Sequence, residues 1–204
     1  METAETNART TRTNRNHAKR KERATMKKTI LGMALFIICE QATANWKVEQ
    51  VRDIMDGSIG VWASSENTKP INKMKFPYND VEAKLSFFCS NGTPEDGVKH
   101  GLIQIQFTSL SIDSTSRASQ YKQYYLLDTR VKWDKDLEIL NLIGEKTKNS
   151  LTTEATDTLI QKLMKHNNMI LELPWHKQGT VHFNFSLIGA SENINKARKI
   201  CQQE

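Results

Sequence analysis

The sequence lacks most of the motifs that point directly to an enzyme. Its nine glycines are scattered singly over 204 residues, which excludes a glycine-rich phosphate-binding loop. There is no G-x-S-x-G motif, and no two histidines are spaced four apart as on a zinc-binding helix. We therefore expect no cofactor and no metal, and we expect the histidines to be solvated or packing residues.

Long hydrophobic runs are also missing. After residue 45, no apolar stretch approaches the about 20 residues of a membrane-spanning helix. In residues 26–44, two lysines precede a short apolar run that ends in Ala42-Thr43-Ala44. This layout is typical of a secretory signal peptide, cleaved between Ala44 and Asn45. We expect residues 1–25 to be a disordered basic leader upstream of an alternative start at Met26, and residues 45–204 to form one periplasmic domain with no stable membrane span.

An excess of charge is absent from that expected domain. The chain has 29 basic and 23 acidic residues, of which nine and four precede residue 45, so 20 and 19 remain. A nearly neutral domain gives no electrostatic reason to expect nucleic acid or anionic lipid as a partner.

Cysteine is scarce. Cys39 lies inside the expected signal, which leaves Cys89 and Cys201. In an oxidising compartment an even pair suggests one disulfide, which would close about 110 residues and restrict the unfolded chain by ~4–5 kcal/mol. Two unrelated buried thiols are the alternative.

Apolar residues recur at regular spacing through most of the expected domain. A period of two predicts strands, and a helical period predicts a helix in 153–166, capped by Thr152 or Thr153, and another from a cap at Ser191 to the C-terminus. These elements predict an α+β fold, a mainly antiparallel sheet or sandwich of about seven to eight strands with two helices. The predicted strands are 46–51, 58–64, 82–89, 102–107, 124–133, 137–143, 169–173 and 180–187. Cys89 and Cys201 both fall on apolar faces, where they could meet.

Few side chains stand out as candidate contacts. Trp133 is flanked by charges and could be an exposed binding anchor, since tryptophan is enriched in hot spots, with packing at the edge of the core as the alternative. Trp62 is expected in the core. The pairs Asp53/Asp56 and Asp134/Asp136 fall in predicted turns, where acids usually cap the turn, and a glycosidase-like pair is the alternative.

Taken together, the order of these motifs resembles the type VI secretion-associated VasI/TagO family of small periplasmic accessory proteins. The resemblance rests on Trp46, the strand and turn Leu85-Ser86-Phe87-Phe88-Cys89-Ser90-Asn91-Gly92, the strands 103–107 and 181–185, Arg130-Val131, the helix around 159–164, Leu187-Ile188-Gly189, and the ending Ala197-Arg198-Lys199-Ile200-Cys201. It implies a non-enzymatic protein that contacts an envelope or secretion-system protein.

One departure from the family pattern concerns Arg130. The family commonly has Arg-Ile-Asp where this chain has Arg130-Val131-Lys132, with the acid delayed to Asp134. Arg130 and Asp134 are therefore candidate contact residues whose pairing would be displaced here.

Two other functional classes stay open from the sequence. An inhibitor of a cell-wall enzyme could use the Ser/Thr-rich loop at 109–120 as a projecting segment, and an envelope hydrolase could use the scattered acids. The identity of the partner and the oligomeric state are left open.

Overall fold

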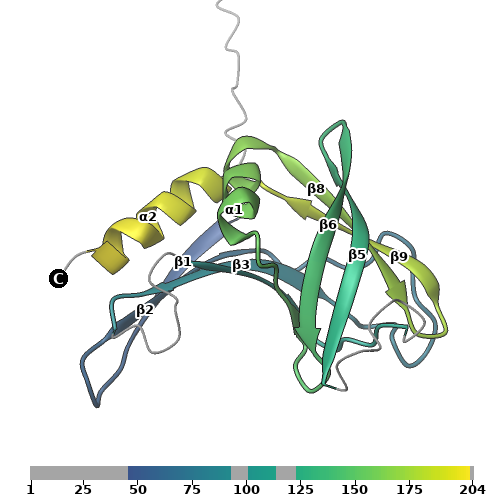
Figure 1. Cartoon of the computed structure of the whole chain (residues 1–204), viewed down its shortest axis with the longest axis horizontal. Coiled ribbons are helices and arrows are strands. Elements are labelled where there is room, and N and C mark those ends of the chain that lie inside the picture. Colours follow the sequence, from purple (N-terminus) through teal and green to yellow (C-terminus); the bar gives the residue numbers. More distant parts are fainter. Residues whose placement is uncertain (1–45, 93–100, 114–122, 203–204) are drawn as a thin grey trace, which may run out of the picture. The chain divides into compact units, whose positions relative to one another are not determined.

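The computed structural model describes residues 46–92, 101–113 and 123–202, all within one compact unit, Glu40–Glu204. These residues form nine strands in two antiparallel sheets and two helices (Figure 1). The predicted α+β class, with the second helix at the C-terminus, is confirmed. The expected leader, signal and cleavage site at Ala44 and Asn45 lie outside the described residues.

Sheet A has the strand order β1-β2-β3-β4-β7, and sheet B has the order β6-β5-β8-β9. All eight predicted strands are present, and β7 is too short for a periodic pattern to reveal it. The bounds in sheet A are β1 Trp46–Arg52, β2 Ile59–Ser65, β3 Ala83–Ser90, β4 Leu102–Phe107 and β7 Ser150–Leu151; those in sheet B are β5 Tyr124–Trp133, β6 Asp136–Glu145, β8 Asn168–Trp175 and β9 Gly179–Ser186.

The two sheets meet where β6 crosses β7. Ile143 and Thr152 exchange two backbone hydrogen bonds of 2.8 Å, just beyond the end of β7. Beside them, a Cβ on Gly144 would lie 2.5 Å from Leu151 and 2.9 Å from the Ser150 carbonyl. Only glycine therefore permits this close approach of the two sheets.

The core lies between the sheets and is rich in aromatic rings. Trp175 and Phe183 of sheet B both pack edge-on against Phe107 of β4 and tilted against each other, with ring centroids 5.5 to 5.9 Å apart. Trp46 is buried and its indole N–H donates to the Ser186 carbonyl at 3.0 Å. The expectation for Trp62 was wrong, because this ring lies half-buried outside the core and packs on Phe88 at 4.6 Å.

The helices α1 (Thr156–Lys165) and α2 (Ala190–Gln202) contact each other, and α2 also packs on β1, β2 and β3 (Figure 1). The predicted caps were wrong. The N-cap of α1 is Ala155, without a side-chain cap bond, and Ser191 lies inside α2. Thr153 instead accepts the Ala155 N–H one step before the helix, at 3.2 Å. Neither described helix is long and apolar enough to cross a membrane.

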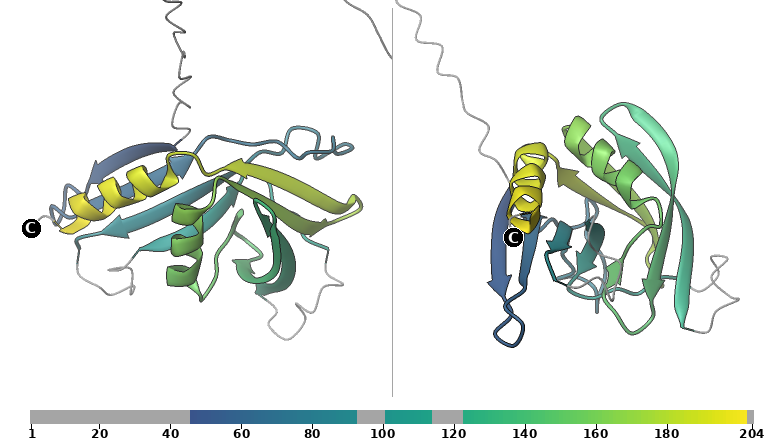
Figure 2. Two further views of the ribbon diagram at one scale, coloured as in Figure 1. Left: turned by 90° about the horizontal axis from the view of Figure 1, so that it is seen from above. Right: turned by 60° about the vertical axis from the view of Figure 1, so that its left-hand side comes forward.

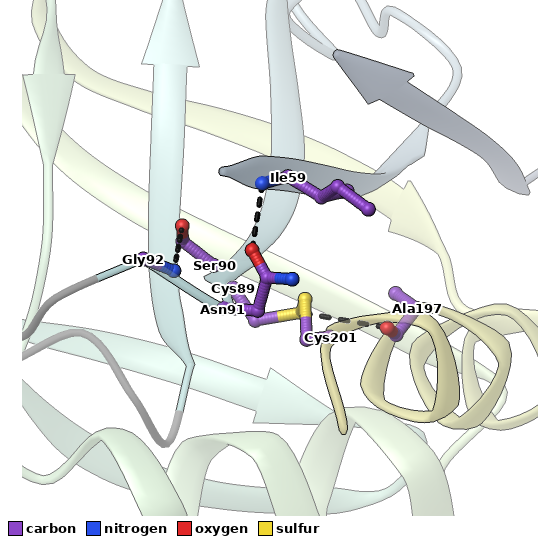
Figure 3. Close-up of a disulfide and its surroundings, with 7 residues drawn as sticks. All are labelled: Ile59, Cys89, Ser90, Asn91, Gly92, Ala197 and Cys201. Carbon is purple, nitrogen blue, oxygen red and sulfur yellow. Dashed lines mark hydrogen bonds between the residues drawn. A yellow bond between two sulfur atoms is a disulfide. The ribbon is translucent and has the colours of Figure 1, made fainter. Parts of the chain in front are cut away.

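Cys89 of β3 and Cys201 of α2 meet as the sequence suggested (Figure 3). Their sulfur atoms are 2.12 Å apart and their Cα atoms 6.2 Å, which is disulfide geometry. This geometry therefore favours a disulfide over two unrelated buried thiols. Next to it, Asn91 accepts the Ile59 N–H at 2.7 Å, so the turn after β3 is also tied to the start of β2.

Candidate functional site

The predicted contact residues gather on the β5–β6 hairpin, but Trp133 is not an exposed anchor. Its side chain is 1% exposed, and its indole N–H donates to Glu138 at 2.6 Å. The alternation of β5 turns Trp133 inward, while its charged neighbours Lys132 and Asp134 are exposed. The packing alternative therefore describes this residue.

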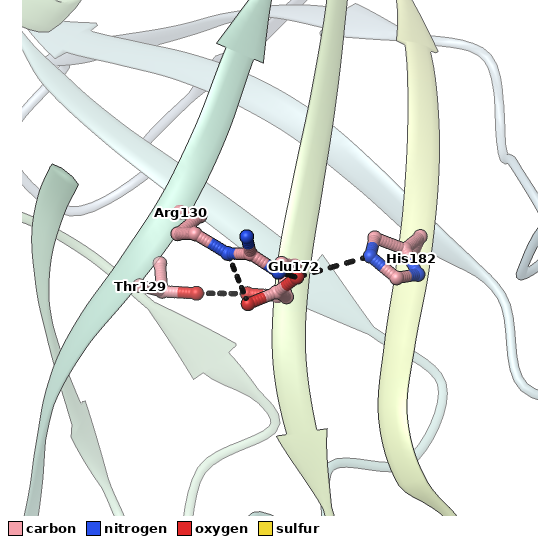
Figure 4. A network of polar contacts seen from close by, with 4 residues as sticks. All are labelled: Thr129, Arg130, Glu172 and His182. Atoms are coloured by element: carbon pink, nitrogen blue, oxygen red, sulfur yellow. Dashed lines mark hydrogen bonds and ion pairs between the residues drawn. The ribbon is translucent and has the colours of Figure 1, made fainter. Parts of the chain in front are cut away.

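Arg130 lies on the outer face of sheet B and pairs with Glu172 of β8. The guanidinium donates to both carboxylate oxygens, at 2.8 and 2.5 Å, and His182 of β9 lies 3.1 Å from the same carboxylate (Figure 4). The Arg130 hydrogen bonds, and more weakly His182, hold the pKa of Glu172 below its usual range. Arg130 thus joins β5 to β8 and does not pair with Asp134.

Asp134 ties the β5–β6 turn to the end of α1. Its carboxylate accepts the Asn167 N–H at 3.2 Å and lies 3.1 Å from His166 Nδ1. Burial alone would raise the pKa of Asp134, but the Asn167 and His166 hydrogen bonds outweigh it and lower the pKa. Asp134 is therefore a turn and helix-end residue, which is the capping role expected for acids in turns.

Glu138 connects the same hairpin to the body of α1. It accepts the Trp133 indole N–H with one oxygen and binds the Lys162 ammonium with the other. Partial burial would raise the pKa of Glu138, but the bonds from Lys162 and Trp133 lower it overall. Trp133, Glu138 and Lys162 form a structural network rather than a ligand site.

The β1–β2 turn (residues 53–58) carries the most exposed large apolar side chains of the described residues, and sequence reasoning missed them. Ile54 is 96% exposed and Met55 is 94% exposed, with Val51 nearby at 57%. The turn extends away from sheet A (Figures 1 and 2). The available signal was two large apolar residues inside an Asp-flanked turn, where polar residues are usual.

Hydrogen bonds within the β1–β2 turn fix its shape. Asp53 accepts the Met55 N–H at 2.6 Å and Asp56 accepts the Ser58 N–H at 2.8 Å. The Asp53 N–H also donates to the Ser58 carbonyl at 2.8 Å, and Gly57 adopts φ +75°. The Ser58 hydrogen bonds lower the pKa of Asp56. Both aspartates are thus occupied with the backbone of their own turn, and they hold Ile54 and Met55 outward.

Several cavities in the described part of the chain are open to solvent. One of them, with a volume of about 340 Å³, lies beside β5, β6 and the approach to α1, between Leu126, Asn141, Ile143 and Glu154. Within the described residues, no three His, Cys, Asp or Glu side chains are grouped to hold a metal ion. His100 and most of the 109–120 loop fall outside that range.

Comparisons with protein-family models, with curated proteins and with solved structures give no match to this chain.

Proposed function

We propose that this is an exported periplasmic accessory protein, acting in type VI secretion or a related envelope process, that binds another protein through its β1–β2 turn. The observation that carries the proposal is the exposure of Ile54 and Met55, 96% and 94%, on a turn held rigid by its own hydrogen bonds. The family resemblance supports the envelope setting.

Such exposure gives the isolated domain no stability. Burying a side chain of this size is worth about 1.5–3 kcal/mol, and here that free energy is available only to a partner that covers the turn. The Asp53 and Asp56 hydrogen bonds fix the backbone before binding, so little conformational entropy is lost on contact. A rigid apolar projection fits a pocket in a partner protein. Because both side chains at its flanks are acidic, it does not fit an anionic lipid surface.

The cysteine pair supports export. Disulfides persist in oxidising compartments and are rare in the cytosol, and Cys89 and Cys201 have disulfide geometry. Intact mass measurement of protein taken from the periplasm tests this part. The expected chain begins at Asn45 and weighs two hydrogens less than its reduced form. A chain that keeps residues 26–44, or one with two free thiols, would contradict export.

Site-specific crosslinking tests the contact. A photoreactive amino acid is placed at position 55 in the chain made by its own cell, with position 49 on the exposed part of β1 as the matched control. We expect an adduct with an envelope or secretion-system protein from position 55 only, lost in I54S. Equal labelling from both positions, or labelling of random abundant proteins, would argue against the turn as a contact site.

The same projection also favours one rival function, inhibition of a cell-wall enzyme, because a projecting apolar turn could enter a substrate cleft. Residues 109–120 are the projecting segment expected from the sequence for this hypothesis, and the exposed β1–β2 turn is a second candidate for that role. A lysozyme assay with the wild-type chain and I54S/M55S separates the two functions. Inhibition by the wild type that is lost in the variant would favour the inhibitor.

A further inference from the structure

In the described part of the chain, β6, the second strand of the β5–β6 hairpin, has an open edge. β6 ends the strand order of sheet B, and among the described residues its outer side bonds only to Thr152, at Ile143. Backbone N–H and C=O groups point to alternate sides along a strand. Since those of Ile143 point away from β5, those of Asn141, Ile139 and Leu137 do as well. Three alternate residues of β6 thus offer backbone donors and acceptors along one edge.

This edge lacks the usual protection against strand pairing. Residues 136–145 contain no proline and no lysine, and the β5–β6 register runs without a bulge from Tyr124↔Glu145 to Trp133↔Asp136. Leu137 and Ile139 are 64% and 61% exposed on the outer face. The one charge between them, Glu138, is turned inward and bound by Trp133 and Lys162. An open edge with two exposed apolar side chains is suited to pairing with another strand.

We infer that the occupant of this edge is the β6 strand of a second copy, paired antiparallel about a two-fold axis at Ile139. In this register Ile139 bonds to Ile139 of the second copy, and Leu137 bonds to Asn141 of the second copy in both directions. All three open residues of each copy are then satisfied, and the two Ile139 side chains lie side by side on the outer face.

Neighbouring registers are excluded by charge and by occupied groups. An axis at Glu138 would set the two Glu138 side chains directly opposite each other, which is destabilising for like charges. An axis at Leu140 would set Leu137 opposite Ile143, whose backbone groups are already bonded to Thr152 at 2.8 Å. The axis at Ile139 avoids both conflicts. A foreign strand would have to supply the apolar match that a second copy already carries.

The expected dimer is weak, because a short ladder buries less than the about 1,200 Å² of a stable interface. Sedimentation velocity of the purified protein should therefore show a monomer at low micromolar concentration and a dimer as concentration rises. I139K places two ammonium groups on the axis and should abolish the dimer. L126K, which changes a partly exposed leucine of β5 on the same face but away from the edge, should leave it intact. Unfolding curves check that both variants fold.

Cysteine crosslinking tests the register itself. In an H-bonded antiparallel pair the Cα atoms lie about 5.5 Å apart, within disulfide range. I139C should therefore form a covalent dimer on mild oxidation. N141C should not, because its two copies would lie about 14 Å apart, but a mixture of L137C and N141C should crosslink. A monomer at every concentration, equal crosslinking of I139C and N141C, or capture of a different protein by I139C in the cell would each overturn the proposal. This outcome is independent of the β1–β2 turn.

Discussion

The β1–β2 and β5–β6 hairpins both have aspartates that bind backbone N–H groups at the turn, but the two turns differ in what they are attached to. In the β1–β2 turn, Asp53 and Asp56 bind only the backbone of their own turn, and the apolar side chains between them face solvent. In the β5–β6 turn, Asp134 reaches across to residues 166 and 167 at the end of α1. The first hairpin is therefore free at its tip, and the second is bound to a helix.

This difference in attachment indicates which hairpin is available as a contact site. Because the β5–β6 hairpin is bound by Asp134 and by the Glu138–Lys162 pair, its charged residues serve the fold. The strands of the β1–β2 hairpin pack against α2, and β2 pairs with β3, which the disulfide joins to α2. The tip of the hairpin has no structural task. Rigidity at the base and freedom at the tip are what a projecting contact element requires.

The largest expected effect comes from removing the disulfide that joins α2 to β3, the strand paired with the β1–β2 hairpin. C89A/C201A should lower the free energy of unfolding by about 2–5 kcal/mol, since the unfolded chain gains the freedom that the disulfide removes. Urea unfolding measures this, with reduced wild-type protein as the control that should show a similar loss. A change below about 0.5 kcal/mol would mean that the sulfur pair does not anchor α2.

A smaller loss should follow from weakening the anchor of the β5–β6 hairpin. E138Q keeps the shape of the side chain but removes its charge toward Lys162, and we expect a loss of about 1 kcal/mol, because both groups are only about two-thirds buried. E49Q, in the exposed part of β1, removes the same charge without touching α1 and should change little. Equal effects of the two substitutions would contradict a specific anchor.

Acid should loosen the β5–β6 hairpin through the same carboxylates. Glu138, Asp134 and Glu172 have lowered pKa values in the fold. Groups with a lowered pKa contribute stability above their unfolded pKa of about 4, and this contribution is lost as pH falls through the folded pKa. The free energy of unfolding should therefore decrease below about pH 4.5, and E138Q should decrease less steeply than the wild type. Parallel pH curves for the two proteins would show that Glu138 does not take part.

Hydrogen exchange compares the two turns directly. D134A should speed exchange of the Asn167 amide several-fold, because that amide loses its acceptor, and the change should reach the end of α1. D53A should speed exchange at Met55 alone. Spread of the D53A effect into β2 or α2 would mean that the two turns do not differ in their attachment.

The smallest effect on stability is expected at the tip of the β1–β2 turn. I54S/M55S should change the free energy of unfolding by less than about 0.5 kcal/mol, since neither side chain is buried. I54S should likewise be stable, and it should lose the crosslink from a photoreactive group at position 55 to the partner. A large loss of stability would show that the tip packs on the domain.

Period-two alternation was enough to place eight strands, because one face of each strand is buried and the side-chain period is fixed by backbone geometry. It also placed Cys89 on an inward face, and the helical period of the C-terminal segment did the same for Cys201. It could not reveal β7, whose two residues hold no period, or the true start of α1 at Thr156, where no side chain caps the helix. The burial of Trp133 followed from the alternation of β5, but the charged neighbours suggested a surface site.

By itself, then, the sequence determined the α+β class, the strand segments, the cysteine pair and the near-neutral charge of residues 45–204, since these depend on local periodicity and composition. Only the tertiary structure decided which partners the charged residues have. Arg130 pairs with Glu172, and Asp134 with His166, across 42 and 32 residues of sequence. It also decided that Ile54 and Met55 are exposed and that no strand among the described residues pairs with the outer edge of β6, because exposure depends on what other segments cover.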